Sequence, residues 1–310
     1  VRHYFDGGSF PVGGSSQIVK TIDPIVTKAG GTILVSADVE NVIIENNTAV
    51  GVQMTDGSQF HAKNIVSNAG IMTTYNKLIP QKTIEKYHFK KQLQKVKRSV
   101  SHASLYIGLD GSPAELDIPK CNYWVYPETG DHDSCVENYL EDLSRPFPLV
   151  YLSFPSAKDP DWSNRYPGKS TIDVITLIPY ETFEAWKDTP WKKRGDDYEA
   201  KKEEIAQRLL KEVYKQLPQV EGKINCYELS SALTTEHFIN YEKGEIYGLD
   251  HSPSRFRQSF LKPRTPIKNF YLTGQDIVTA GVGGALFSGV LTTMAMTGKN
   301  VLKRIQETPK

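Results

Sequence analysis

The sequence predicts an α/β fold made of two interleaved domains. Short strands alternate with helices at both ends of the 310-residue chain, and runs typical of antiparallel strands fill its middle. The length suits about two domains, and no repeat or low-complexity linker separates them. We therefore expect domains that are threaded through one another, with changes of character near residues 75 and 235.

The composition excludes several classes of protein. The chain has 37 lysine and arginine residues and 36 acidic residues. Because the net charge is only +1, there is no strong positive electrostatic field that would attract nucleic acid. The three cysteines are widely spaced and form no CxxC pair, which argues against a disulfide framework or a zinc site. No stretch reaches the roughly 18–20 apolar residues that span a bilayer, and no signal-peptide pattern is present. Because the sequence starts at Val1 in what already resembles the interior of a domain, we expect a piece of a longer protein.

The first element expected is a helix over residues 16–29. Ser15 and Ser16 suit its N-terminal cap, and Gly30 with Gly31 ends it. Pro24 falls inside the helix and predicts a kink or a break. The apolar residues at helical spacing are Ile18, Val19, Ile22, Ile25 and Val26.

Four short strands are expected between residues 32 and 70. The stretch TILVS comes first, a small meander follows, and an apolar strand leads to Gly70. Asn46-Asn47 and Asp56-Gly57 occupy turns, because these residues tolerate the positive φ of tight hairpins. Together with the preceding helix, these strands predict a compact α/β unit.

The middle of the chain, residues 76–235, predicts a larger antiparallel sheet. A basic helical segment over 82–98 precedes strand-like runs such as SHASLYIGLD, NYWVY, PLVYLSFP and STIDVITLIP. Residues 198–218 predict an amphipathic helix. Its apolar face comprises Ile205, Leu209, Leu210, Val213 and Leu217.

The chain closes with a strand, a glycine-rich turn and a long helix, beginning YLTGQDIVTAGVGGALFSG. The helix N-terminus offers free N–H groups, and its glycines let another molecule approach the main chain. Asp276 is placed to accept hydrogen bonds from hydroxyl groups. The helix is apolar on all sides in its first half, so we expect it to be buried against a sheet. Spacing alone supports equally a bound anion or electron-rich ring and a close helix–strand packing with Asp276 as a cap.

The same stretch resembles the closing FAD motif of the flavin-dependent amine oxidase and phytoene desaturase superfamily. The segments YFDGGSFPVGGSSQI and NIVSNAGIMTTYNKLIP resemble two other parts of that superfamily. The resemblance implies that Gly274 and Asp276 contact FAD near its ribityl and pyrophosphate groups. The residues that it implies beside the isoalloxazine ring are Gly281, Val282, Gly283, Gly284 and Ala285.

Stretches in the middle, among them NYWVYPETGDHD and LTTEHFINYEKGEIYGLDHSPSRF, resemble the retinol saturase branch of the superfamily more narrowly. The resemblance implies that residues 1–75 are part of an FAD-binding Rossmann-like domain and 76–235 an α+β substrate domain with a mixed or antiparallel sheet. Residues 236–310 would be the closing FAD-binding segment and C-terminal helix. No GxGxxG turn opens a helix after a strand here, so we expect an incomplete FAD-binding domain. We expect this piece alone to bind FAD weakly or not at all, and to be inactive.

Saturation of a carbon–carbon double bond needs a proton as well as a hydride. The candidate proton sources precede the terminal motif and are Glu236, His237, Tyr241, Tyr247 and His251. The weak catalytic candidates among them are Glu236, His237 and Tyr247. Each has a structural alternative, such as an ordinary structural histidine at 237 or a core tyrosine in a turn at 247.

Two further features have competing interpretations. The basic run from Lys82 to Arg98 suits a solvated helix face, or docking on an anionic membrane surface. Docking would make the protein membrane-associated on the cytoplasmic or endoplasmic reticulum side, without a transmembrane segment. The aromatic residues that suit a core first and a polyene tunnel second are Trp124, Tyr126, Trp162, Phe183 and Trp186.

Three functions follow as hypotheses. The first is an FAD-dependent oxidoreductase that saturates a double bond of a polyene lipid, a retinoid or a carotenoid, with NAD(P) as a candidate electron donor. The second keeps the fold but isomerises or desaturates a carotenoid. The third is a non-catalytic module that binds apolar ligands or partner subunits. A GxGxxG turn upstream would exclude the third, and the product mass separates saturation from isomerisation.

Overall fold

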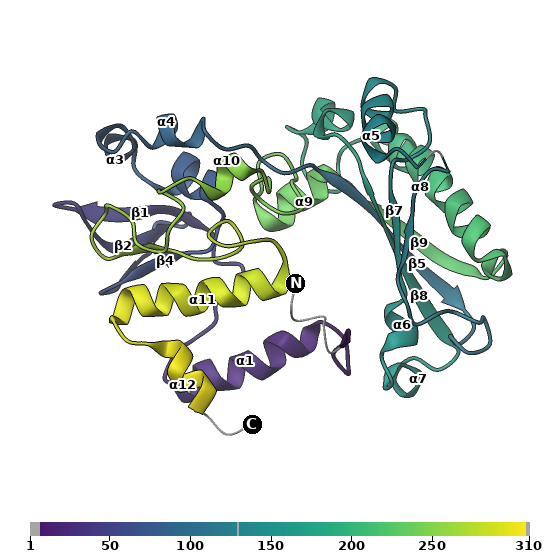
Figure 1. Cartoon of the computed structure of the whole chain (residues 1–310), viewed down its shortest axis with the longest axis horizontal. Coiled ribbons are helices and arrows are strands. Elements are labelled where there is room, and N and C mark those ends of the chain that lie inside the picture. The colour runs from purple at the N-terminus through teal and green to yellow at the C-terminus, as the bar shows by residue number, and fades with distance from the viewer. Residues whose placement is uncertain (1–6, 129, 308–310) are drawn as a thin grey trace. The chain divides into compact units, whose positions relative to one another are not determined.

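The structure is a computed structural model that describes residues 7–128 and 130–307, and it confirms a mixed helix-and-sheet fold (Figure 1). The chain divides into two compact units, each built from two separate stretches. Unit 1 comprises Val1–Ile33 and Ser101–His237, and unit 2 comprises Leu34–Val100 and Phe238–Lys310. The domain limits expected near residues 75 and 235 stay a prediction. Residues 4–6, which open the YFDGGSFPVGGSSQI segment, lie outside the described residues.

Unit 1 is built on a five-stranded antiparallel sheet with the strand order β6-β7-β8-β5-β9, as the sequence of the middle predicts. Strand β5 lies between β8 and β9, and in β8 every second residue is buried. This alternation is typical of an antiparallel sheet. The strands are β5 (His102–Asp110), β6 (Tyr123–Val125), β7 (Val150–Ser153), β8 (Lys169–Leu177) and β9 (Ile224–Ser230).

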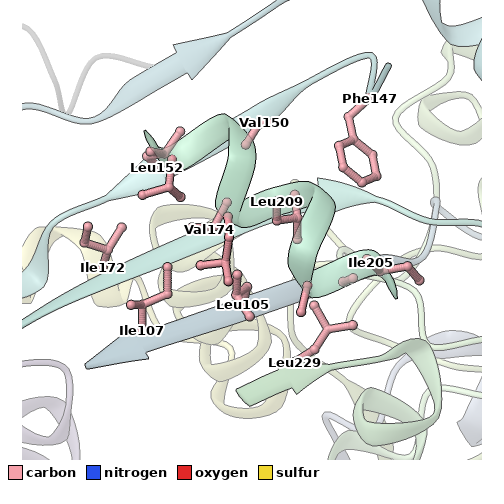
Figure 2. Packing of buried hydrophobic residues seen from close by; sticks show 14 of the residues in the cluster. Leu105, Ile107, Phe147, Val150, Leu152, Ile172, Val174, Ile205, Leu209 and Leu229 are labelled. Atoms are coloured by element: carbon pink, nitrogen blue, oxygen red, sulfur yellow. The ribbon is translucent and has the colours of Figure 1, made fainter. Parts of the chain in front are cut away.

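Helix α8 (Asp196–Gln216) packs on this sheet. Figure 2 shows Ile205 and Leu209 of α8 beside Leu105, Val174 and Leu229 of the strands. All five residues of the predicted apolar face are buried, which confirms the prediction. Three acidic residues in the first turn also stabilise the helix, because their negative charges interact favourably with the partial positive charge at its N-terminus.

The predicted N-terminal helix forms as α1 (Ser16–Lys28). It continues through Pro24, so the alternative of a break is wrong: a proline removes a single i→i−4 bond, and the turns on both sides persist. No residue of α1 is buried. The other helices of unit 1 are α5 (His132–Glu141), α6 (Pro155–Lys158) and α7 (Trp162–Arg165), with short turns at Tyr180–Thr182, Glu184–Trp186 and Pro218–Val220. Helix α9 (Ala232–Ile239) begins in unit 1, and its last two residues belong to unit 2.

The aromatic residues of unit 1 serve the core only in part. Phe183 is fully buried and packs edge-on against Tyr198, with ring centroids 5.7 Å apart. Trp186 lies against the same cluster. Trp124 and Tyr126 are exposed at 58% and 45%, so these two rings do not belong to the core.

Unit 2 opens with an antiparallel meander of β1 (Val39–Glu45), β2 (Thr48–Met54) and β3 (Gln59–His61). Asn46 and Asn47 form its first turn with φ of 46° and 65°, which confirms the predicted tight hairpin. The strand expected at TILVS does not form. No described strand pairs with this stretch, and its apolar side chains stay in solvent.

A second sheet of unit 2 pairs β4 (Ile65–Ser67) with β10 (Phe270–Leu272) in parallel. The carboxyl ends of parallel strands meet at one edge, so the segments that follow residues 67 and 272 lie close together. The helices of unit 2 are α2 (Ile71–Thr73), a π-helical turn (Thr74–Leu78), α3 (Gln81–Lys86), α4 (Phe89–Leu93), α10 (Pro253–Phe256), α11 (Gly281–Thr297) and α12 (Val301–Glu307).

The C-terminal helix differs from the prediction in two ways. It is broken after α11 at Gly298, whose φ of +69° ends the helix, and α12 follows. Only small or hydroxyl-bearing residues of α11 are buried, namely Gly284, Ser288 and Thr292. The large apolar residues Val282, Leu286 and Phe287 are 64%, 64% and 43% exposed. The helix packs on β10 through this narrow stripe alone, so the expectation that its apolar first half is buried against a sheet is wrong for the large apolar residues.

This exposure makes a prediction for Leu286. Replacement by serine is expected to change the free energy of unfolding by no more than about 0.5 kcal/mol, the range of surface substitutions, whereas a core leucine costs about 2–5 kcal/mol on truncation. Chemical denaturation of the wild type and Leu286→Ser measures the difference. A loss in the core range would mean that α11 is buried on this side.

The basic run folds as α3 and α4 with a break at His88, which is left-handed at φ 54°. Its apolar residues face the core of unit 2, while the lysines are exposed. The buried residues are Ile84, Phe89, Leu93 and Val96. This pattern favours a solvated helix face. Within the described residues, no helix combines the length and the apolar character that crossing a bilayer requires.

Candidate functional site

The candidate site lies in unit 2, where β4 and β10 end. Gly274 follows β10 with φ +99°, and a Cβ there would overlap the side-chain oxygen of Asn68, so only glycine fits. The N–H of Gly274 donates to Ser288 Oγ at 2.7 Å, and Thr292 Oγ1 donates to the carbonyl of Leu272 at 2.9 Å. These bonds fix the strand, the turn and helix α11 to one another.

Asp276 joins three segments of unit 2. It is 3% exposed, its Oδ2 accepts from the N–H of Ile71 at 2.8 Å, and its Oδ1 accepts from the N–H of Leu249 at 2.8 Å. Gly70 and Gly248 precede these donors, and a Cβ at Gly248 would overlap the carboxylate. Both oxygens are therefore engaged, and a ligand hydroxyl would share them with backbone amides.

Arg255 secures the turn from the other side. Its guanidinium is 1% exposed and donates to the carbonyls of Gln275 at 2.7 Å and Asp250 at 3.2 Å. Burial lowers the pKa of Arg255, and the carboxylates of Asp276 and Asp250 oppose that shift. A buried cation with carbonyl acceptors and nearby carboxylates holds residues 274–276 in one conformation.

Two of the candidate proton sources predicted from the sequence, Tyr241 and His251, contact this turn. The Tyr241 hydroxyl accepts from Gln275 Nε2 at 3.1 Å, and burial raises the Tyr241 pKa, so the phenol stays protonated at neutral pH. His251 Nε2 accepts from the N–H of Ala280 at 2.8 Å, directly before α11. Tyr241 and His251 thus belong to the site by geometry.

The first turn of α11 is open. Gly281, Val282, Gly283 and Ala285 are exposed, and no described residue accepts a hydrogen bond from the N–H groups of residues 281–283. A Cβ at Gly281 would meet nothing within 4 Å, whereas one at Gly284 would overlap the carbonyl oxygen of Thr279. Open N–H donors on a fixed, glycine-lined turn fit the electron-rich edge of a flavin, so the residues present suit that cofactor.

The structure shows other contacts for two of the three weak catalytic candidates and exposes the third. Glu236 and His237 belong to unit 1, where Glu236 accepts from the Tyr180 hydroxyl at 2.9 Å. His237 is exposed and stacks on Trp191, with ring centroids 4.9 Å apart. Tyr247 is in unit 2 but 45% exposed.

Sequence reasoning missed Glu245, Gln275 and Arg255. Glu245 is 2% exposed, its Oε1 lies 3.5 Å from Arg98 Nε, and burial raises its pKa. It lines a small pocket together with Tyr241 and Asp276. Nothing in the local sequence distinguishes Glu245 and Arg255 from solvated residues, because their burial depends on contacts with distant segments. In the described part of the chain, no three His, Cys, Asp or Glu residues come together as metal ligands.

Comparison with known proteins shows the family to which the chain belongs. The family model described as flavin containing amine oxidoreductase matches residues 1–297. All-trans-retinol 13,14-reductase of Danio rerio is 38% identical over 303 residues, which cover 94% of this chain and 50% of that protein. Prolycopene isomerase of Arabidopsis thaliana is 29% identical over 294 residues, or 94% of this chain and 45% of that protein.

The solved structures agree on the fold. An oxidoreductase from Methanosarcina mazei superimposes with a TM-score of 0.54 at 16% identity, covering 93% of this chain and 55% of that one. The chain therefore spans about half the length of the relatives it matches.

Proposed function

Because the chain belongs to the family of flavin-containing amine oxidoreductases, we propose that the protein saturates a carbon–carbon double bond of a polyene lipid similar to retinol, with FAD as cofactor. The observation that carries the proposal is the 38% identity, over 94% of this chain, to a protein named for reduction of all-trans-retinol. The open turn of α11, held on β10 and β4, supports it from the geometry.

The residues of this chain would hold the cofactor. The N–H groups of Gly281, Val282 and Gly283 would donate to the pyrimidine edge of the isoalloxazine, with Gly284 and Ala285 beside it. Gly274 and Asp276 would lie near the ribityl and pyrophosphate groups, and Asp276 would accept from a ribityl hydroxyl. FAD, when bound, supplies hydride chemistry, while the protein supplies orientation and a proton.

The proton source is proposed among the residues that reach the turn. Tyr241 keeps its proton at neutral pH and is tied to the turn through Gln275. Glu236, His237 and Tyr247 stay weaker candidates. NAD(P) as the electron donor, and contact with an anionic membrane surface through the exposed lysines of residues 82–97, belong to the same proposal.

The reaction is expected to add two hydrogens to the substrate. We propose anaerobic incubation of the intact protein with FAD, dithionite and all-trans-retinol, followed by mass spectrometry of the product. A product heavier by two hydrogen atoms supports saturation. An unchanged retinol pool, with FAD bound, would contradict a retinol-like substrate. Weak or absent FAD binding by the 310-residue chain alone is the result expected of an incomplete FAD-binding domain, whereas failure of the full-length protein to bind FAD would contradict the proposed cofactor.

A second function keeps the same site. The 29% identity to prolycopene isomerase favours isomerisation of a carotenoid, in which reduced flavin causes no net redox change. The same incubation with a cis-carotene distinguishes the two, because isomerisation leaves the mass unchanged and shifts only the retention time and absorbance.

A further inference from the structure

The first turn of α11 is held by a histidine from a distant loop. Ala280, the residue before the helix, receives no capping bond from a side chain of its own helix. Its N–H donates instead to His251 Nε2 at 2.8 Å, and the Thr279 hydroxyl lies 3.1 Å from the same nitrogen. The first four N–H groups of a helix have no acceptor within the helix, and the His251 ring nitrogen accepts from one of them.

This contact requires a neutral imidazole. Nε2 accepts a hydrogen bond only when it carries no proton. The charged and titratable groups facing the ring are Arg255, whose Nη1 lies 3.1 Å away, and the carboxylates of Asp250 and Asp276. The ring of Phe256 contacts it edge-on, with centroids 5.7 Å apart. His251 is exposed, but its partial desolvation and the Arg255 cation both favour the neutral form and lower its pKa, while the two carboxylates oppose that shift.

We propose that neutral His251 is a positioning residue, which docks the loop before α10 on the first turn of α11 and so holds the N–H groups of Gly281–Gly283 ready for the flavin. The role of the turn as a flavin contact rests on the proposed function; the docking itself does not. Arg255 connects the loop that carries His251 to the turn before α11, because it lies beside His251 and donates to the carbonyl of Gln275.

The consequence is a dependence on pH with a definite sign. The His251 pKa is lowered in the folded chain below its ordinary value of about 6.5. Between these two values the unfolded chain binds more protons than the folded one, so the stability of the docked turn rises with pH. Docking is therefore complete above about pH 6.5 and is lost as the pH falls through the lowered pKa.

Two measurements test the proposal in the intact protein. The first follows the ¹⁵N shifts of the His251 ring in the wild type, assigned by the signal that His251→Gln removes, together with deuterium exchange of residues 280–287 between pH 7.5 and 5. We expect a neutral ring with unprotonated Nε2 at pH 7.5. Amide exchange slows intrinsically as the pH falls, so it is compared as protection factors, and those of residues 280–287 should decrease as the ring protonates. Glutamine retains an acceptor but does not titrate, so the protection factors of His251→Gln should not depend on pH, whereas those of the exposed His61→Gln should change as in the wild type.

The second measurement is FAD affinity by flavin fluorescence over the same range. Wild-type affinity should fall about fivefold, the effect of one lost hydrogen bond, as the pH is lowered through the His251 pKa, and the affinity of His251→Gln should not change with pH. A protonated Nε2 at pH 7.5, or identical pH profiles of exchange in the wild type and His251→Gln, would overturn the positioning role. If neither the full-length wild type nor its His251→Gln variant binds FAD, the proposed function fails, and the ring shifts and exchange still decide the inference.

Discussion

Replacement of Asp276 by alanine is expected to lower the free energy of unfolding of unit 2 by roughly 2–6 kcal/mol, because two buried N–H groups lose their acceptor at about 1–3 kcal/mol each. Ile71 and Leu249 donate to this carboxylate from segments far apart in the sequence, and Arg255 lies beside it. Alanine offers these two N–H groups no acceptor. The Arg255 cation also loses a neighbouring negative charge. Thermal and chemical denaturation measure the loss.

The matched variants separate the hydrogen bonds from the change of charge. Asp276→Asn keeps the shape and one acceptor oxygen, so its stability should lie between the wild type and Asp276→Ala. Asp56→Ala removes an exposed carboxylate that accepts from the N–H of Ser58 at 2.9 Å, and should cost less than about 1 kcal/mol. FAD affinity should follow the same order under the proposed function. Equal stability of Asp276→Ala and Asp56→Ala would mean that the carboxylate does not hold the three segments.

The sequence predicts those elements whose stability is local. Helix α8 has its apolar face at regular spacing, and the Asn46-Asn47 hairpin has the two residues that its φ values require, so both form as predicted. Elements that depend on distant partners were less predictable. TILVS has the composition of a strand but no described strand beside it, and α11 is apolar although its buried stripe is glycine, serine and threonine.

The same distinction between local and distant contacts applies to the candidate site. Glycine spacing alone leaves a bound group and close helix–strand packing as equal alternatives for residues 274–285. A Cβ at Gly274 or Gly284 would overlap Asn68 or Thr279, as close packing requires, whereas the space at Gly281 is open. Glu245 and Arg255 could not be singled out, because charged residues are ordinarily exposed and nothing nearby signals their burial. Their burial depends on segments that are distant in the sequence, because Glu245 lies against Arg98 and Arg255 donates to the carbonyl of Gln275. The double role of Asp276 as an acceptor for two backbone amides could not be foreseen for the same reason.

Gly284 should be the least replaceable glycine of the terminal helix. A Cβ at this position would overlap the backbone carbonyl of Thr279, and a backbone atom cannot turn aside as a flexible side chain does. Gly284→Ala is therefore expected to lower the free energy of unfolding by roughly 1–3 kcal/mol, the range for overpacked sites, although alanine favours a helix interior by about 1 kcal/mol. The strain can relax only by moving the first turn of α11, where His251 docks and where we propose that the flavin binds.

Gly289 provides a control in the same helix. Nothing lies within 4 Å of a Cβ at that position, so Gly289→Ala should gain up to about 1 kcal/mol from helix propensity alone. The two alanines make the same chemical change five residues apart, and opposite shifts in melting temperature would isolate the contact with Thr279. Faster deuterium exchange of residues 280–287 in Gly284→Ala, together with weaker FAD binding, is the combined result expected of a displaced turn. A stabilised Gly284→Ala would mean that the helix start lies farther from Thr279 than the structure shows, and the close approach at this turn would have to be abandoned.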